Sequence, residues 1–277
     1  MADFKFTCPH CEQHLEASEE ILGATIQCPS CKKDLTLAKP VSPDGSMLID
    51  HIAPPPPLAQ AKQSSRFTFR ETTSLTKLLK ILFGANAAMA IVCLFSNWLQ
   101  FELLSRGTFS LIEGHANDSR QQIVALFTEI LSLVTAVLFL RWVYRANQNV
   151  RALGAQGLGI TPGWAVGYFF VPIFSLWRPY QAMRDLWKAS KNPNAWQSVV
   201  PGSILQLWWL FWIISSSLGW AAFRASMGAR NIESLKAATT NQIVSNVVEI
   251  PLCILALILV SQIQLSQNAA RASNTPL

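Results

Sequence analysis

The chain has 277 residues, of which 51% are hydrophobic and 14% are charged, whereas about 25% are charged in ordinary soluble domains. This composition excludes an ordinary soluble protein and indicates a membrane protein. The formal net charge is +6, but most Lys and Arg residues stand at the ends of apolar runs, where they determine topology. The charge is therefore weak support for a polyanionic partner such as nucleic acid.

Two Cys-x-x-Cys pairs lie near the N-terminus, Cys8/Cys11 and Cys28/Cys31. Their separation falls within the spacing that is typical of zinc sites. Each two-residue spacer lets both thiolates face one ion, and two pairs complete a tetrahedral shell. We therefore predict a structural Zn²⁺ site with no open position for a substrate. Disulfides or redox dithiols are the alternative, which a reducing cytosol and the presence of two pairs disfavour.

Residues 1–39 are predicted to form a small β zinc ribbon, with short strands leading into the knuckles at residues 4–6 and 25–27. The segment resembles bacterial zinc ribbons with a Cys-Pro-x-Cys knuckle. A common version has Gly after each second Cys, where this chain has Glu12 and Lys32, so less regular turns are expected. Asp and Glu outnumber Lys in this segment, so we expect no nucleic acid but a cytosolic protein partner or a purely structural role.

Residues 40–74 contain a four-proline run at 54–57 and no apolar periodicity, which predicts a flexible linker with a stiff section. No apolar signal-peptide core follows Met1, so we expect the ribbon to stay in the cytosol. The remaining two cysteines, Cys93 and Cys253, lie inside apolar runs and are interpreted as small packing residues.

Four apolar runs are long enough to cross about 30 Å of hydrocarbon: residues 81–101, 123–144, 204–223 and 243–263. They predict an all-α membrane helix bundle over residues 75–265, followed by a polar tail at 266–277. Tryptophans near the run ends suit an interfacial aromatic belt: Trp98, Trp142 and Trp220. The membrane domain requires the lipid bilayer as its partner, and the oligomeric state stays open.

A fifth run, residues 163–177, is short. Thr161 can cap a helix and Pro162 fits its first position, while Pro172 interrupts it. The segment is predicted to be either a kinked span or a re-entrant segment. The Lys and Arg distribution favours the re-entrant alternative modestly, and both place the ribbon in the cytosol. Beyond it, the spacing of Trp177, Tyr180, Met183 and Trp187 predicts an interfacial amphipathic helix.

The chain also repeats weakly at an offset of about 120 residues. Ile112-Glu113 matches Ile232-Glu233, and Glu129-Ile130 matches Glu249-Ile250. We therefore predict an internal repeat of about residues 98–149 and 220–269. Parallel copies would place the two intramembrane carboxylates in equivalent positions, where they could share one site.

Several polar residues within or beside the spans are candidate functional residues. Glu129 and Glu249 are either an intramembrane polar site or snorkel to the interface, and their expected hydrogen-bond partners are Asn86, Gln206 and Asn246. Three arginines are either topology anchors or contacts for lipid phosphates: Arg141, Arg145 and Arg178. Ser215, Ser216 and Ser217 are expected to ease helix packing. No sequence motif of an enzyme was found, so a non-enzymatic protein is expected.

The membrane part carries a distinctive string of motifs, Arg-Trp-Val-Tyr-Arg-Ala-Asn at 141–147, Pro-Gly-Trp-Ala-Val-Gly at 162–167 and Leu-Trp-Arg-Pro-Tyr-Gln-Ala-Met at 176–183. Residues 75–265 resemble an uncharacterised bacterial membrane family, catalogued as a domain of unknown function. The resemblance implies a location in the cytoplasmic membrane and no activity. Two functions remain: a membrane-anchored regulatory or scaffold protein, and a small transporter or channel that uses Glu129 and Glu249.

Overall fold

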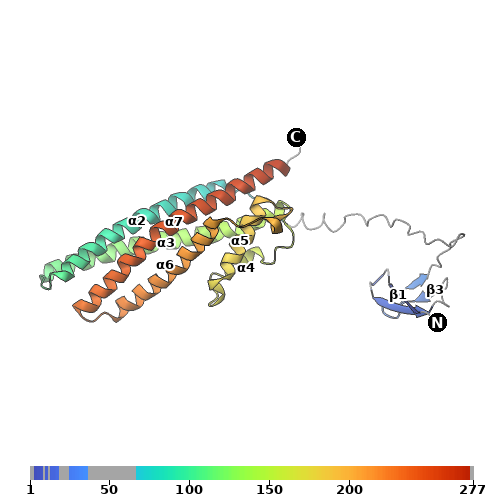
Figure 1. The fold of residues 1–277 in the computed structure, drawn as a ribbon, viewed down its shortest axis with the longest axis horizontal. Coiled ribbons are helices and arrows are strands. Elements are labelled where there is room, and N and C mark those ends of the chain that lie inside the picture. The colour runs from blue at the N-terminus through green and yellow to red at the C-terminus, as the bar shows by residue number, and fades with distance from the viewer. Residues whose placement is uncertain (1–2, 9, 12, 19–24, 37–66, 275–277) are drawn as a thin grey trace. The chain divides into compact units, whose positions relative to one another are not determined.

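The computed structural model describes residues 3–8, 10–11, 13–18, 25–36 and 67–274. The chain divides into two compact units, residues 1–56 and 57–277, which are described separately (Figure 1). Most of the predicted linker, residues 40–66, lies outside the described residues. Residues 67–72 belong to the second unit, because the amide of Arg70 donates to Asn149 Oδ1 at 2.9 Å and Asn149 Nδ2 donates back to the Arg70 carbonyl at 2.9 Å.

The first unit contains two antiparallel hairpins. Strand β1 (Asp3–Thr7) pairs with β2 (His14–Ser18), and β3 (Thr25–Gln27) pairs with β4 (Asp34–Thr36). Each connection between paired strands contains one Cys-x-x-Cys pair. The hairpins therefore bring both pairs to the turn ends of their strands, as the sequence predicted for the knuckles.

The second unit is built on four long helices. They are α2 (Thr73–Ser105), α3 (Leu111–Ala152), α6 (Ser203–Gly228) and α7 (Ile232–Asn274). Helices α2 and α6 both pack along α7, and α3 packs along α2. All four are long and apolar enough to cross a membrane, which makes them candidate membrane spans and agrees with the four predicted apolar runs. At about 1.5 Å per residue, α3 and α7 each exceed the hydrocarbon thickness, so their ends extend beyond it.

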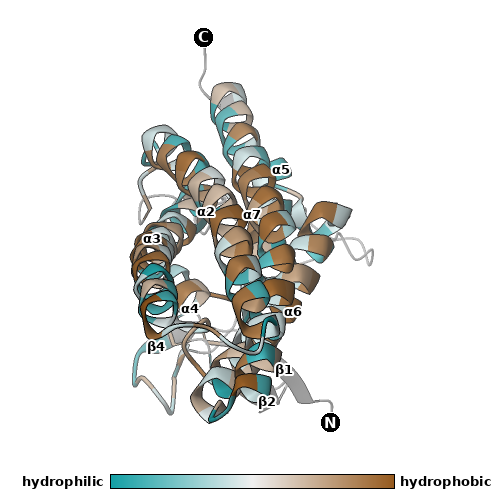
Figure 2. Cartoon of the chain, turned by 90° about the vertical axis from the view of Figure 1, so that its left-hand side faces the viewer, coloured by the Kyte–Doolittle hydropathy of each residue, from teal (hydrophilic) through white to brown (hydrophobic). Residues whose placement is uncertain are grey.

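The apolar surface of these helices faces outward, as a bilayer requires. In the most apolar 18-residue stretch of α3, 6% is buried inside the protein. Large side chains such as Phe127 and Leu133 are more than 60% exposed. Figure 2 shows hydrophobic stretches along the long helices. In water this much exposed apolar surface would be unfavourable, and it is compatible with a lipid bilayer.

The buried core lies at one end of the bundle, where α2 and α6 begin and α3 and α7 end. Short elements cover this end: α4 (Pro162–Gly167), η2 (Phe174–Leu176), α5 (Arg178–Lys191) and η3 (Trp196–Ser198). We call it the α5 end. Met183 and Leu186 of α5 are fully buried there, so the apolar face of the predicted interfacial helix is covered by protein instead of lipid.

A polar network ties the helices together at the α5 end. Gln264 Oε1 accepts from Thr72 Oγ1 at 2.6 Å and from Thr76 Oγ1 at 2.9 Å. Trp142 Nε1 donates to Thr76 Oγ1 at 2.9 Å, and its side chain is fully buried. The prediction that Trp142 belongs to an interfacial belt is therefore wrong, whereas Trp98 and Trp220 are 53% and 61% exposed.

The central segment does not cross the bundle. Thr161 caps α4, with its side chain accepting from the Trp164 amide at 3.3 Å, but the helix ends at Gly167 and turns follow. Six helical residues reach about 9 Å, which is too short to span. A Cβ added at Gly154 would meet Asn194 Oδ1 at 3.2 Å, so both flanks lie at the α5 end. This arrangement favours the re-entrant alternative of the two that the sequence predicted.

Candidate functional site

The four cysteines of the first unit form a compact cluster. All four sulfurs lie within 4.8 Å of one another. The Cys8 and Cys31 sulfurs are 3.8 Å apart, and those of Cys11 and Cys28 are 3.7 Å apart. A tetrahedron with Zn–S bonds of about 2.3 Å has S–S edges of about 3.8 Å. The four side chains therefore fit a single zinc-sized ion.

The backbone around the cluster favours thiolates unequally. Amide groups of Cys31 and Ser30 lower the pKa of Cys28 to about 6. For Cys11, the Gln13 amide lowers the pKa, but desolvation and the three neighbouring thiols raise it to about 11. Like charges at such distances disfavour one another. The positive charge of a divalent ion bound here would offset that repulsion, and its binding would release the remaining protons.

Two matching backbone bonds hold the knuckles. The Cys8 amide donates to the Gln13 carbonyl, and the Cys28 amide donates to the Lys33 carbonyl, both at 3.0 Å. Lys32 has φ of 54°, in the left-handed region where Gly is preferred. Lys32 thus adopts the backbone conformation that Gly favours, and the less regular turn expected from the sequence stays a prediction. The equivalent position, Glu12, lies outside the described residues.

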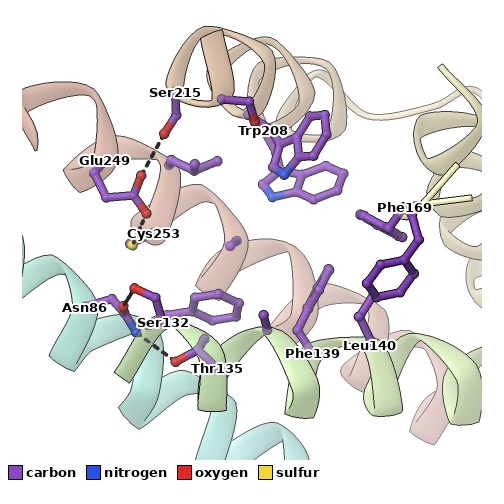
Figure 3. A pocket seen from close by; sticks show the side chains of 17 residues that line it. Asn86, Ser132, Thr135, Phe139, Leu140, Phe169, Trp208, Ser215, Glu249 and Cys253 are labelled. Atoms are coloured by element: carbon purple, nitrogen blue, oxygen red, sulfur yellow. Dashed lines mark hydrogen bonds between the residues drawn. The ribbon is translucent and has the colours of Figure 1, made fainter. Parts of the chain in front are cut away.

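Glu249 lines a cavity of about 400 Å³ between α2, α3, α6 and α7. We call it the aromatic cavity (Figure 3). Ser215 Oγ on α6 donates to Glu249 Oε2 at 2.7 Å, and Cys253 Sγ lies 3.7 Å from Glu249 Oε1. Ser215 therefore has a role that the sequence analysis missed, since the serine run was expected only to ease packing. No sequence signal paired it with Glu249, because the two residues belong to different helices.

A second polar cluster lines the same cavity. Asn86 Nδ2 on α2 donates to Thr135 Oγ1 on α3 at 2.8 Å, and Ser132 Oγ donates to Asn86 Oδ1 at 3.2 Å. Asn86 was expected to contact one of the glutamates, but its hydrogen-bond partners among the described residues all belong to α2 and α3. Figure 3 shows this cluster across the cavity from Glu249, with Phe139 and Trp208 to one side.

Glu129 lines a different cavity, of about 300 Å³, which we call the polar cavity. Its walls include the amide side chains of Asn97, Gln100, Gln121, Gln242 and Asn246. Gln100 Nε2 donates to Thr239 Oγ1 at 2.8 Å, joining α2 to α7. Asn246 Nδ2 is buried without a hydrogen-bond partner within the described part of the chain.

The structure therefore does not bring the two carboxylates together. The side chain of Glu129 is exposed, and that of Glu249 is partly buried. The third predicted partner, Gln206, is exposed near the start of α6. The matched residues of the predicted repeat do lie at corresponding places, since Glu113 and Glu233 both stand in the first turn of their helices. The repeat itself stays a prediction.

The three candidate lipid-contacting arginines have different surroundings. Arg141 is exposed and Arg145 is partly buried, both on α3. Arg178 begins α5, where its guanidinium lies 5.6 Å from the centre of the Tyr168 ring and donates to Gln181 Oε1 at 3.2 Å. Its Nε is buried without a partner among the described residues. Arg178 thus packs within the α5 end, whereas Arg141 is available to the surroundings.

Comparison with known proteins gives one match. A search of curated proteins and a search of solved structures each found no match. A family model described as "Domain of unknown function (DUF4328)" matches residues 110–265, which contain all three motif strings noted in the sequence. It does not include residues 75–109, to which the predicted resemblance also extended. Because the match spans more than half of the chain, the protein belongs to the DUF4328 family, which is defined by a domain of unknown function.

Proposed function

We propose that the protein is a membrane-anchored regulatory or scaffold protein whose N-terminal unit holds a structural Zn²⁺ and docks a cytosolic protein partner. The observation that carries the proposal is the tetrahedral spacing of four sulfurs in a unit separate from the membrane helices. Four thiolates fill the shell of Zn²⁺. The ion would stabilise a surface for binding, and no coordination position is left for catalysis.

The proposed location is the cytoplasmic membrane, with the zinc ribbon and the α5 end in the cytosol. Basic residues support this orientation. The α5 end and its adjoining turns carry Arg70, Arg151, Arg178, Lys188 and Arg271, among others, and the positive-inside rule places such clusters in the cytosol. Reporters fused near Gly154 and near Asn192 should both be cytosolic, and one near Arg230 should be outside. If either of the first two reporters were outside the cell, this topology would be contradicted.

Partner binding is tested in intact cells by proximity labelling from the N-terminus of the full-length protein. Cys28→Ser removes one thiolate and should abolish labelling of specific partners, because a small module without its metal loses its fold. Cys93→Ser is the matched control, since Cys93 lies on α2 in the bundle. Equal labelling with both variants would refute a metal-dependent docking role.

A small transporter or channel is the second candidate function. It is favoured by the two cavities between the helices, each with one carboxylate in its wall. Carboxylates inside a membrane are costly and often mark ion pathways. Cation uptake by proteoliposomes, lost on Glu129→Gln or Glu249→Gln, would support this function. Impermeable proteoliposomes would exclude it.

A further inference from the structure

Aromatic rings from four parts of the chain line the aromatic cavity. The centre of the Phe139 ring lies 6.2 Å from that of Trp208 and 6.2 Å from that of Phe169. The Phe169 and Trp212 rings are 6.3 Å apart and nearly perpendicular. These contacts join α3, α6 and the turn after α4. The rings thus present both edges and faces to a molecule in the cavity.

The carboxylate of Glu249 faces this cavity with neutral partners. Its hydrogen-bond donors are the Ser215 hydroxyl at 2.7 Å and the Cys253 thiol at 3.7 Å. No Lys, Arg or His is among the described residues that line the cavity. A carboxylate that stays ionised in low dielectric needs a countercharge nearby. Within the described part of the cavity wall, the chain does not supply one.

These two features together define a class of ligand. Ring faces of Trp and Phe attract cations within about 6 Å of the ring centre, and the carboxyl group of Glu249 can supply the counterion. The volume of about 400 Å³ lies within the range of small-molecule sites, about 300–1,000 Å³. An apolar body would fill the space between the rings, while its positive centre would lie beside the carboxylate.

Other occupants fit less well. A small metal ion prefers several oxygen ligands of high charge, and Glu249 is the one carboxylate in the described lining. A neutral lipid tail would leave the carboxylate without a countercharge. An anionic headgroup would be repelled by it. The combination of one carboxylate with Phe139, Trp208 and Trp212 therefore favours an organic cation.

We propose that the aromatic cavity binds a lipophilic organic cation, with Glu249 as its counterion and the surrounding aromatic rings as its walls. The cavity lies between candidate membrane-spanning helices, so the proposed route of entry is from the membrane, where such a ligand partitions. This inference goes beyond the regulatory role and does not rest on it, because it concerns binding by the membrane unit.

The test is equilibrium binding of radiolabelled tetraphenylphosphonium to the purified full-length protein in detergent micelles. Tetraphenylborate has the same shape and the opposite charge, so it separates charge recognition from partition into micelles. We expect saturable binding of the cation and none of the anion. Saturable binding of both ions with similar affinity, or of neither, would overturn the proposal.

Two variants locate the site. Glu249→Gln should weaken cation binding about tenfold or more, equivalent to about 1.4 kcal/mol per factor of ten. Glu102→Gln removes an exposed carboxylate at the end of α2 and should leave the affinity unchanged. If Glu249→Gln fails to fold, as judged by gel filtration, Trp212→Leu and Trp212→Phe replace it. Leucine should weaken binding several-fold more than phenylalanine, and equal affinities would overturn the aromatic part of the site.

Discussion

Replacing Gln267 with alanine should loosen the α5 end. The Gln267 side chain is fully buried in α7. Its Nε2 donates to the Ala146 carbonyl at 3.1 Å and lies 3.2 Å from Ser190 Oγ, while its Oε1 accepts from Asn149 Nδ2 at 3.4 Å. One side chain thus joins α3, α5 and α7.

The expected magnitude follows from these three contacts. A hydrogen bond contributes about 1 kcal/mol in proteins generally and about 0.6 kcal/mol between helices in a membrane protein. Three bonds, together with the lost packing of a buried side chain, give a decrease of about 3 kcal/mol in the free energy of unfolding. Gln206→Ala on the exposed face of α6 is the matched control and should change it by less than about 0.5 kcal/mol.

The assay is reversible unfolding in mixed micelles with increasing sodium dodecyl sulfate, followed by circular dichroism. Gln267→Met, which keeps the side-chain volume but removes the amide, separates hydrogen bonding from packing and should lie between wild type and alanine. If Gln267→Ala were no more destabilising than Gln206→Ala, the polar network would not hold the α5 end together.

Three further predictions concern point substitutions, the last of them a pair. Gly154→Ala should destabilise the bundle by about 1–3 kcal/mol in the same assay, because φ is +104° and Asn194 Oδ1 crowds the new Cβ; Gly159→Ala, with open space around it, should be nearly neutral. Lys32→Gly should stabilise the zinc-loaded N-terminal unit by about 0.5–1 kcal/mol, because φ at this position is 54°. The thermal unfolding midpoint should therefore rise, and a lower midpoint would refute this. Glu129→Gln and Glu249→Gln should have additive effects on unfolding within about 0.5 kcal/mol, because they line separate cavities; strong coupling would restore a shared site.

Local rules predicted the parts of the fold that depend on neighbouring residues in the chain. The four spans follow from apolar run length, and the start of α4 follows from Thr161 and Pro162. The sequence did not show that α4 would end at Gly167, five residues before Pro172. The sequence also did not predict that Pro251 lies inside a continuous α7. Packing against neighbouring helices can retain a proline within a long membrane helix.

Contacts between helices explain most of what sequence reasoning missed. Trp142 stands near the end of an apolar run, as an interfacial residue would. In the structure its side chain is buried and donates a hydrogen bond to Thr76 of α2. The partner of Glu249 is Ser215, 34 residues earlier, and nothing in a single sequence specifies which faces of two apolar helices meet. The cysteine cluster was easier to predict, because metal-ligand spacing is a local property of each knuckle.

The central claim, that the N-terminal unit holds a structural metal, is tested most directly by the zinc content of the intact purified protein. We predict about one zinc per chain in the wild type and in Cys93→Ser, and none in the double variant Cys8→Ser/Cys28→Ser. Chelation should abolish the ordered first unit while leaving the helical signal of the membrane unit unchanged. A wild-type protein that contains no zinc, or a double variant that keeps it, would contradict the account.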